Sequence, residues 1–340
     1  MSSGPAVRSG PWSRGSSTQE EESSPLSKPA TPVPVNTRNN ENSSRLGATD
    51  LFMLLAVLIW AFNFSVVKIA LKEFTPGSFN GPRLTIASLL LLLFLRLKEG
   101  SVAPPRGDLL RLIALGVVGN TFYQYLFING LHRTSASATS LILTMTPILI
   151  ALFSAVFIRE RIHWIGWLGI LTSFFGLYFV VFGNSAGVSL GEEGLKGNLM
   201  ILLGNLFWAI YTVFSKPMLE RMSPLRLATL TLFFGTLFYL PLTAREIAGM
   251  PWGSLSARSW AALVFSAVFA IALSYVIWYS SVKRVGNTKT GIFGNITPVF
   301  SVFFAHLFLD EKVGLTKVVG TLIIILGFYL TRFGHRWFKK

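Results

Sequence analysis

The sequence contains no cysteine and little charge, since only 13% of its 340 residues are Asp, Glu, Lys or Arg. The missing cysteine excludes disulfide bonds, thiolate catalysis and cysteine-ligated metals. A soluble domain carries about 25% charged residues, so this chain has too few to cover a water-soluble globule. Because 51% of the residues are hydrophobic, the composition indicates a membrane protein.

Acidic residues are also missing from the interior of the apolar runs, where none of the 15 Asp and Glu residues lies. Proton relays and organic-cation sites inside membranes depend on such carboxylates. Hydrolysis by paired carboxylates and carboxylate-ligated metals need them as well. Gly191-Glu-Glu-Gly194 is not a phosphate-binding loop. We therefore expect no enzyme activity, no cofactor and no metal.

Apolar runs separated by short polar stretches fill the chain from Leu51 onward. Each is long enough to cross the hydrocarbon core of a bilayer, about 30 Å thick, as a helix. Continuous runs indicate helices, whereas alternation would indicate a barrel. We predict an all-α polytopic membrane protein with ten transmembrane helices, at residues 51–71, 79–97, 109–131, 135–158, 163–183, 197–217, 224–244, 258–281, 286–309 and 314–334.

Residues 1–48 are rich in Ser, Pro, Gly and Asn, and we predict a disordered cytoplasmic tail without the apolar region of a signal peptide. Lys and Arg are more frequent in one set of alternate connections, which places that set in the cytoplasm. Both termini then face the cytoplasm at the cell (inner) membrane. The net charge of +15 reflects this topology, and we expect no nucleic-acid partner. The poorer, extracytoplasmic set comprises Lys68, Lys72, Arg133, Lys196, Arg245, Arg258, Lys312 and Lys317.

Short motifs recur in order between the two halves of the chain. Trp60-Ala61 recurs as Trp208-Ala209, a shift of 148 residues, and Thr146-Pro147 recurs as Thr297-Pro298, a shift of 151 residues. The shift of 151 also carries Gly169 and Gly176 onto Gly320 and Gly327. With five spans in each copy, the second copy enters the membrane upside down, and such inverted repeats enclose a substrate site at their interface. The predicted repeats are residues 49–184 and 196–335.

At these motifs the sequence resembles the EamA domains of the drug/metabolite transporter superfamily, over about residues 50–335. The resemblance implies a ten-helix carrier, usually with both termini inside, that often exports amino acids or related metabolites. It does not identify the substrate. It is carried by Trp60-Ala61, the stretch 130–147, Arg159-Glu160-Arg161, Gly286-Asn287-Thr288, Thr297-Pro298 and Asp310-Glu311-Lys312.

Neutral polar and aromatic side chains recur at helical spacing inside the spans, for example at Asn120, Tyr123, Gln124 and Phe127. Polar groups in hydrocarbon cost free energy unless they are paired, so these stripes should face the interior. These side chains either bind substrate or form packing contacts and hydrogen bonds between helices. The candidate substrate-binding residues are Trp60, Asn63, Arg83, Asn120, Tyr123, Gln124, Thr144, Trp208, Tyr211, Tyr275, Trp278 and Asn295.

Arg83 and two prolines have more specific expected roles. Arg83 follows Gly81-Pro82 with no acidic residue nearby in sequence, so it pairs with an anionic group such as an amino acid carboxylate, or else reaches to the interface. Pro147 and Pro298 each remove a helix hydrogen bond in mid-span, and we predict gating hinges there rather than static kinks.

We therefore predict a secondary transporter, not an enzyme, that moves a small metabolite outward by alternating access without a buried carboxylate. The expected solute is an amino acid or a related compound, and the expected partners are this solute and the lipid bilayer. Two alternatives stay open: a proton-coupled multidrug efflux carrier and a non-transporting membrane scaffold. A homodimer through the faces that carry Gly169, Gly176, Gly320 and Gly327 is a further possibility.

Overall fold

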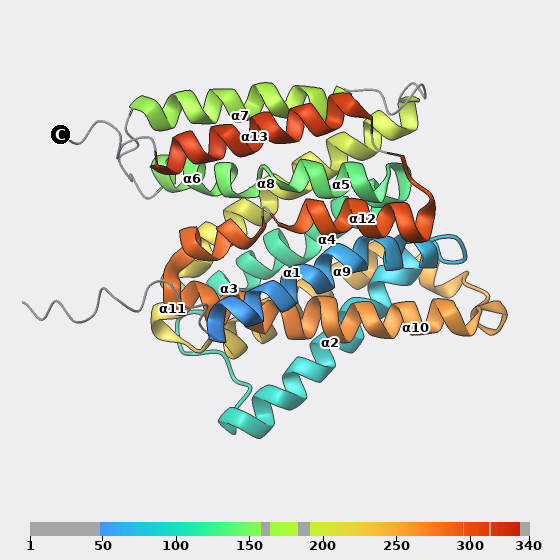
Figure 1. The fold of residues 1–340 in the computed structure, drawn as a ribbon. Helices are drawn as coiled ribbons and strands as arrows, with labels where there is room; N and C mark the ends of the chain where they lie inside the picture. The colour runs from blue at the N-terminus through green and yellow to red at the C-terminus, as the bar shows by residue number, and fades with distance from the viewer. Residues whose placement is uncertain (1–47, 158–163, 183–190, 295, 313, 334–340) are drawn as a thin grey trace, which may run out of the picture. The chain divides into compact units, whose positions relative to one another are not determined.

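A computed structural model describes residues 48–157, 164–182, 191–294, 296–312 and 314–333, and every regular element among them is a helix (Figure 1). The predicted tail therefore lies almost entirely outside the described residues. The helices are α1 (Ala48–Ala70), α2 (Pro76–Glu99), α3 (Leu109–Gly116), η2 (Val117–Phe122), α4 (Tyr123–Arg133), α5 (Ala136–Leu143), α6 (Thr146–Phe157), α7 (Trp164–Phe182), α8 (Glu192–Arg221), α9 (Pro224–Ala248), η3 (Trp252–Ser254), α10 (Ala257–Phe265), η4 (Ser266–Leu273), α11 (Ser274–Gly294), α12 (Thr297–Leu309) and α13 (Leu315–Phe333).

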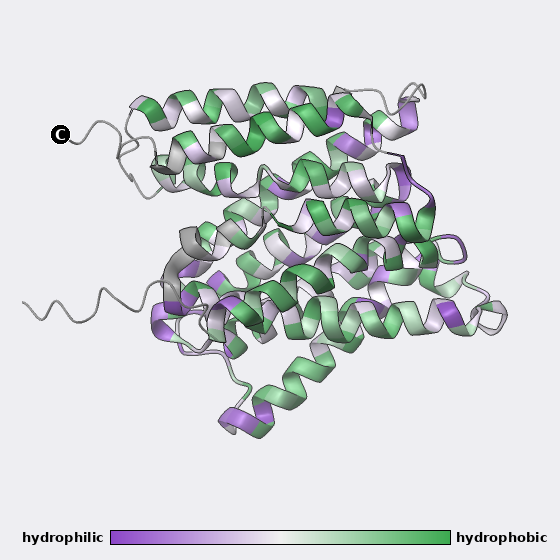
Figure 2. Cartoon of the chain, in the orientation of Figure 1, coloured by the Kyte–Doolittle hydropathy of each residue, from purple (hydrophilic) through white to green (hydrophobic). Residues whose placement is uncertain are grey.

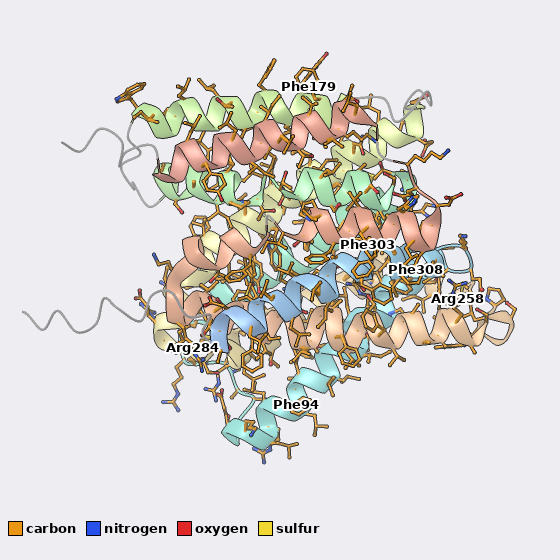
Figure 3. The ribbon with its side chains drawn as sticks, in the orientation of Figure 1. Phe94, Phe179, Arg258, Arg284, Phe303 and Phe308 are labelled. Atoms are coloured by element: carbon orange, nitrogen blue, oxygen red, sulfur yellow. The ribbon has the colours of Figure 1, made fainter. Side chains whose placement is uncertain are left out.

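The all-helical membrane architecture is confirmed by the lengths and composition of these helices. In the described part of the chain, seven helical stretches are long and apolar enough to cross a membrane, and three shorter apolar helices accompany them. Hydrophobic residues follow the lengths of the helices, whereas hydrophilic ones gather at helix ends and connections (Figure 2). Phe94, Phe303 and Phe308 are exposed on the outside of the bundle, as lipid-facing side chains are (Figure 3).

The starts of the helices follow local capping signals. Thr75 forms a capping box with Ser78 ahead of Pro76, and Ser223 caps α9 ahead of Pro224. A proline in the first turn is tolerated because the N–H that it lacks has no partner there. The repeated Thr-Pro and Ser-Pro pairs therefore mark the start of α2 and of its counterpart α9.

Both prolines predicted to kink a helix in mid-span stand instead at the start of a new helix. The fourth predicted span is divided into α5 and α6 by a turn at residues 144–145, and Pro147 is the second residue of α6. Pro298 likewise lies in the first turn of α12. The Thr146 hydroxyl lies within hydrogen-bond distance of two acceptors: the Leu143 carbonyl, which Pro147 leaves without an amide donor, at 2.7 Å, and Asn205 Oδ1 at 2.6 Å. The expected distortion is therefore a full helix break.

One predicted helix boundary is wrong, because α11 continues to Gly294 across the expected break at residues 282–285. In the first half, Ser135 accepts a hydrogen bond from the Ala138 amide and starts α5. The shift of 151 residues carries Ser135 onto Gly286, which has no side chain for capping. Without this cap the helix has no local signal to restart.

The helix pair α7–α13 joins the two halves through glycines (Figure 1). A Cβ on Gly176 would lie 2.6 Å from the Gly320 carbonyl oxygen, and one on Gly327 would lie 2.4 Å from the Gly169 carbonyl oxygen. Residue numbers rise along α7 as they fall along α13, so the helices are antiparallel. The four glycines thus contact each other within one chain.

The pair α2–α9 is antiparallel as well. The Thr229 hydroxyl of α9 lies 3.4 Å from the Leu91 carbonyl oxygen of α2, and the Glu246 carboxylate accepts a hydrogen bond from the Gly77 amide at 2.8 Å. Further contacts join a helix of one half to helices of the other half. Helix α1 packs against α11 and α12, and α8 packs against α4, α5 and α6. Each half therefore supplies the partners of the other.

Candidate functional site

A cavity of about 110 Å³ lies between the two halves. One water needs about 10–15 Å³ of such space, so the cavity has room for a solute of roughly ten non-hydrogen atoms. Among the described residues none that lines it is acidic; the lining is Trp60, Asn63, Phe64, Arg83, Tyr123, Gln124, Phe127, Ser140, Leu143, Thr146, Pro147, Trp208, Ala270, Ile271, Tyr275, Trp278, Gly294 and Thr297.

Five aromatic rings form one wall of the cavity. The centroids of Trp208 and Tyr123 lie 5.0 Å apart, and those of Trp208 and Tyr275 lie 5.5 Å apart. Trp60 and Trp278 are also 5.5 Å apart. Tilted rings at these spacings stabilise one another. The wall is therefore a preformed apolar surface to which α1, α4, α8 and α11 contribute.

Polar contacts hold this wall in place. The Trp60 indole N–H donates to the Ala270 carbonyl at 2.8 Å, within the π-helical stretch η4. The Ser266 hydroxyl donates to Asn63 Oδ1 at 2.6 Å. The Gln124 side-chain amide donates to the Tyr275 hydroxyl at 3.0 Å. Each contact joins a residue of one half to a residue of the other.

Gln124 and Tyr275 are separated by 151 residues, the shift between the two halves. The π-helical stretches η2 and η4 occupy matching positions in the third and eighth predicted spans, and π-bulges are frequent at functional sites. Residues that the shift of 151 relates thus meet at the cavity.

Arg83 is the cation of the cavity. Its side chain extends from α2, is 3% exposed, donates to Asn80 Oδ1 at 2.9 Å and lies 6.0 Å from the centroid of the Phe79 ring. Its Nε has no hydrogen-bond partner among the described residues. A buried cation without an acidic partner is costly, so this guanidinium is suited to binding an anionic group of a solute.

Two further buried atoms of lining residues, Gln124 Oε1 and Trp278 Nε1, have no hydrogen-bond partner in the described part of the chain. One accepts and the other donates a hydrogen bond. With the guanidinium, they are unpartnered polar groups beside the aromatic wall. This combination fits a small amphipathic solute with one anionic group.

The structure brings most of the predicted site residues to the cavity and places others elsewhere. Trp60, Asn63, Arg83, Tyr123, Gln124, Trp208, Tyr275, Trp278 and Pro147 line it. Asn295 lies outside the described residues. Asn120, Thr144, Tyr211 and Pro298 are described but do not line the cavity.

Three of those residues make other contacts, either with a neighbouring helix or at the end of their own helix. The Tyr211 hydroxyl lies 2.7 Å from the Thr231 hydroxyl of α9, and the Thr144 hydroxyl donates to the Leu141 carbonyl at 2.6 Å. A Cβ on Gly235 would lie 2.4 Å from the Cβ of Asn120, so Asn120 packs closely against α9.

Phe64 and Leu143 line the cavity but are not among the residues predicted from the sequence. Phe64 follows Trp60 by four residues, and the i, i+4 spacing that places both on one face of α1 was available. Leu143 lies at the end of α5, beside the helix break. Its position depends on that break, which Pro147 indicates only as a distortion of one continuous helix.

Replacing Pro147 by alanine is expected to slow the transport predicted from the sequence several-fold, and more than it lowers expression. Alanine favours a continuous helix by about 3 kcal/mol relative to proline, so α5 and α6 would join and stiffen beside the cavity. Initial transport rates and membrane yields of Pro147→Ala would be compared with those of Pro241→Ala, which changes a proline inside α9 that does not line the cavity. Wild-type rates for Pro147→Ala would refute a hinge at this position.

Comparison with known proteins assigns the chain to a family. The EamA-like transporter family matches residues 47–182 and, a second time, residues 195–333. An uncharacterized transporter of Archaeoglobus fulgidus is 27% identical over 284 residues, which cover 83% of this chain and 96% of the relative. The uncharacterized transporter YyaM of Bacillus subtilis is 26% identical over 277 residues, which cover 81% and 90%. A solved crystal structure with 18% identity shares the fold with a TM-score of 0.61, over 86% of this chain and 99% of that chain.

Proposed function

Because the chain belongs to the EamA-like transporter family, we propose that it moves small solutes with a carboxylate, such as amino acids or related metabolites, out of the cell. The observation that carries this proposal is Arg83, a buried guanidinium that lines a ring-walled cavity in which no acidic residue takes part. The guanidinium binds the carboxylate in a bidentate manner, and the aromatic wall contacts the apolar part of the solute.

The proposed mechanism is alternating access between two inverted halves. In the predicted repeat, α13 is the counterpart of α7 and α9 that of α2. If equivalent helices cross a membrane in opposite directions, the halves that contain them are inverted, and the antiparallel packing of both pairs supports this arrangement. The cavity at the interface then opens to each side in turn.

The proposed orientation places all ten helical stretches across the cell membrane, with both termini in the cytoplasm. Arg258 and Arg284 lie at opposite ends of the bundle (Figure 3), and the charge count assigns Arg284 to the cytoplasmic side. We propose that no acidic side chain carries protons through the protein. The solute then moves down its own concentration gradient or in exchange for another solute. Since the glycine faces of α7 and α13 pair with each other, a homodimer would use other surfaces.

A counterflow screen with purified protein in liposomes tests this function. Radiolabelled amino acids are offered beside the amines that result from removing their carboxylate. We expect exchange of at least one amino acid, and rates about 100-fold lower for its amine, because the amine leaves the buried guanidinium unpaired. Preferred exchange of the amines, or collapse of transport with an uncoupler in the absence of a solute gradient, would contradict the proposal and favour a drug efflux carrier.

A further inference from the structure

Glu311 follows directly after the end of α12, where the backbone conformation is defined by hydrogen bonds. Asp310 has a left-handed backbone (φ 55°), and it ends the helix. The Asp310 amide donates to the His306 carbonyl and the Glu311 amide to the Ala305 carbonyl, both at 3.2 Å. Hydrogen bonds of this kind close helices that end in a left-handed residue. The side chain of Glu311 is thereby held away from its own helix.

The Glu311 carboxylate binds the start of α5, 175 residues away in the sequence. The Ala136 amide donates to one carboxylate oxygen at 2.9 Å, and the Ser137 amide donates to the other at 3.0 Å. These first amides of a helix have no partner within it, and the helix dipole favours a negative charge at this place. One side chain of the second half thus completes the N-terminus of a helix of the first half.

This contact lies between the cavity and one end of the bundle. On α1, Phe64 lines the cavity and Lys68 lies four residues further along; on α5, Ser140 lines the cavity three residues after Ser137. At about 1.5 Å per residue, these steps correspond to roughly 6 Å along α1 and roughly 4.5 Å along α5. A second hollow of about 280 Å³ begins there, and its lining includes Lys68, His132 and Glu311. The contact between Glu311 and α5 therefore lies between the cavity and this second hollow.

We propose that Glu311 is a latch that closes this end of the cavity by holding α12 against α5. The proposal rests on the proposed transport function, under which this end is extracytoplasmic. When the contact opens, the carboxylate and the two amides regain water, so its net strength is modest. A contact of this strength forms and breaks in every transport cycle.

The test uses the absence of native cysteine, which makes a single introduced thiol unambiguous. Ser140→Cys places the thiol in the cavity lining, and a membrane-impermeant thiosulfonate is applied to intact cells and, separately, to inside-out vesicles. The labelling rate is compared with and without Glu311→Gln, which removes the charge but keeps the shape. Glu73→Gln is the matched control, because Glu73 accepts hydrogen bonds from the amide and the hydroxyl of Ser256, both at 2.8 Å, at the start of α10 without lining either hollow.

We expect Glu311→Gln to raise labelling from outside about tenfold or more, the factor that corresponds to a lost charge-assisted hydrogen bond, while labelling from inside does not rise. Glu311→Asp keeps the charge on a shorter side chain. Its labelling rate from outside should lie between that of the protein with Glu311 and that of Glu311→Gln. Unchanged labelling from outside, an equal rise from both sides, or an equal rise in Glu73→Gln would overturn the latch. Since labelling needs no substrate, a failed transport assay together with one-sided labelling would refute the proposed solute and leave the latch intact.

Discussion

Replacing Arg83 by glutamine is expected to lower the exchange of carboxylate solutes about 100-fold, because the buried carboxylate of the solute then lacks its charged partner. Arg83→Lys should retain only part of the rate, since a lysine ammonium binds a carboxylate as a point charge rather than through a planar fork. Folding should be preserved, because Arg83 has no acidic partner in the cavity whose charge would be left unpaired.

The measurement is the initial counterflow rate in liposomes, with the melting temperature of each purified variant beside it. Lys216→Gln removes an exposed cation of α8 outside the cavity and should leave the rate unchanged. A wild-type rate in Arg83→Gln would exclude the guanidinium from solute binding. An equal loss in Lys216→Gln would trace the effect to total charge and not to the cavity.

Replacing Gly320 by valine is expected to destabilise the protein more than any other single change considered. A Cβ at this position would lie 2.7 Å from the Gly176 carbonyl oxygen and 2.8 Å from the Cβ of Phe179. Neither atom is the end of a flexible side chain, so α7 and α13 must separate along the pair. Overpacking costs about 1–3 kcal/mol or more, and membrane helices depend on close packing for their association.

The melting temperature and the yield of detergent-solubilised protein measure this effect. Gly204→Ala is the control, because a Cβ on Gly204 would find its nearest neighbours at 3.4 Å, an ordinary contact distance. We expect a clear loss of stability for Gly320→Val and little change for Gly204→Ala. If Gly320→Val were as stable as the wild type, the glycine pairing would not hold the two halves together.

The inward-facing aromatic and amide residues could be predicted because helical spacing and the repeat reinforce each other. The stripe that contains Tyr123 and Gln124 identifies one face of a helix, and the shift of 151 residues pairs Gln124 with Tyr275. The hydrogen bond between these two side chains confirms that pairing. Arg83 could be singled out because a cation without an acid nearby in sequence is unusual inside a span.

Periodicity does not distinguish a cavity from a helix contact, since both require an inward face. Tyr211 and Thr144 lie on inward faces, yet they bond to Thr231 and to the Leu141 carbonyl, away from the cavity. Helix breaks were equally hard to predict, because they depend on single caps. Ser135 starts a new helix, whereas Gly286, at the equivalent position, does not.

The inversion of the two halves is the claim on which the transport account rests, and the sidedness of two equivalent positions tests it most directly. The shift of 148 residues carries Lys72 onto Glu220, and both side chains are exposed. Each is replaced by cysteine in turn, and cells are treated with an impermeant maleimide before and after permeabilisation. The account predicts labelling of Lys72→Cys in intact cells and of Glu220→Cys only after permeabilisation. Labelling of both positions from the same side of the membrane would contradict it.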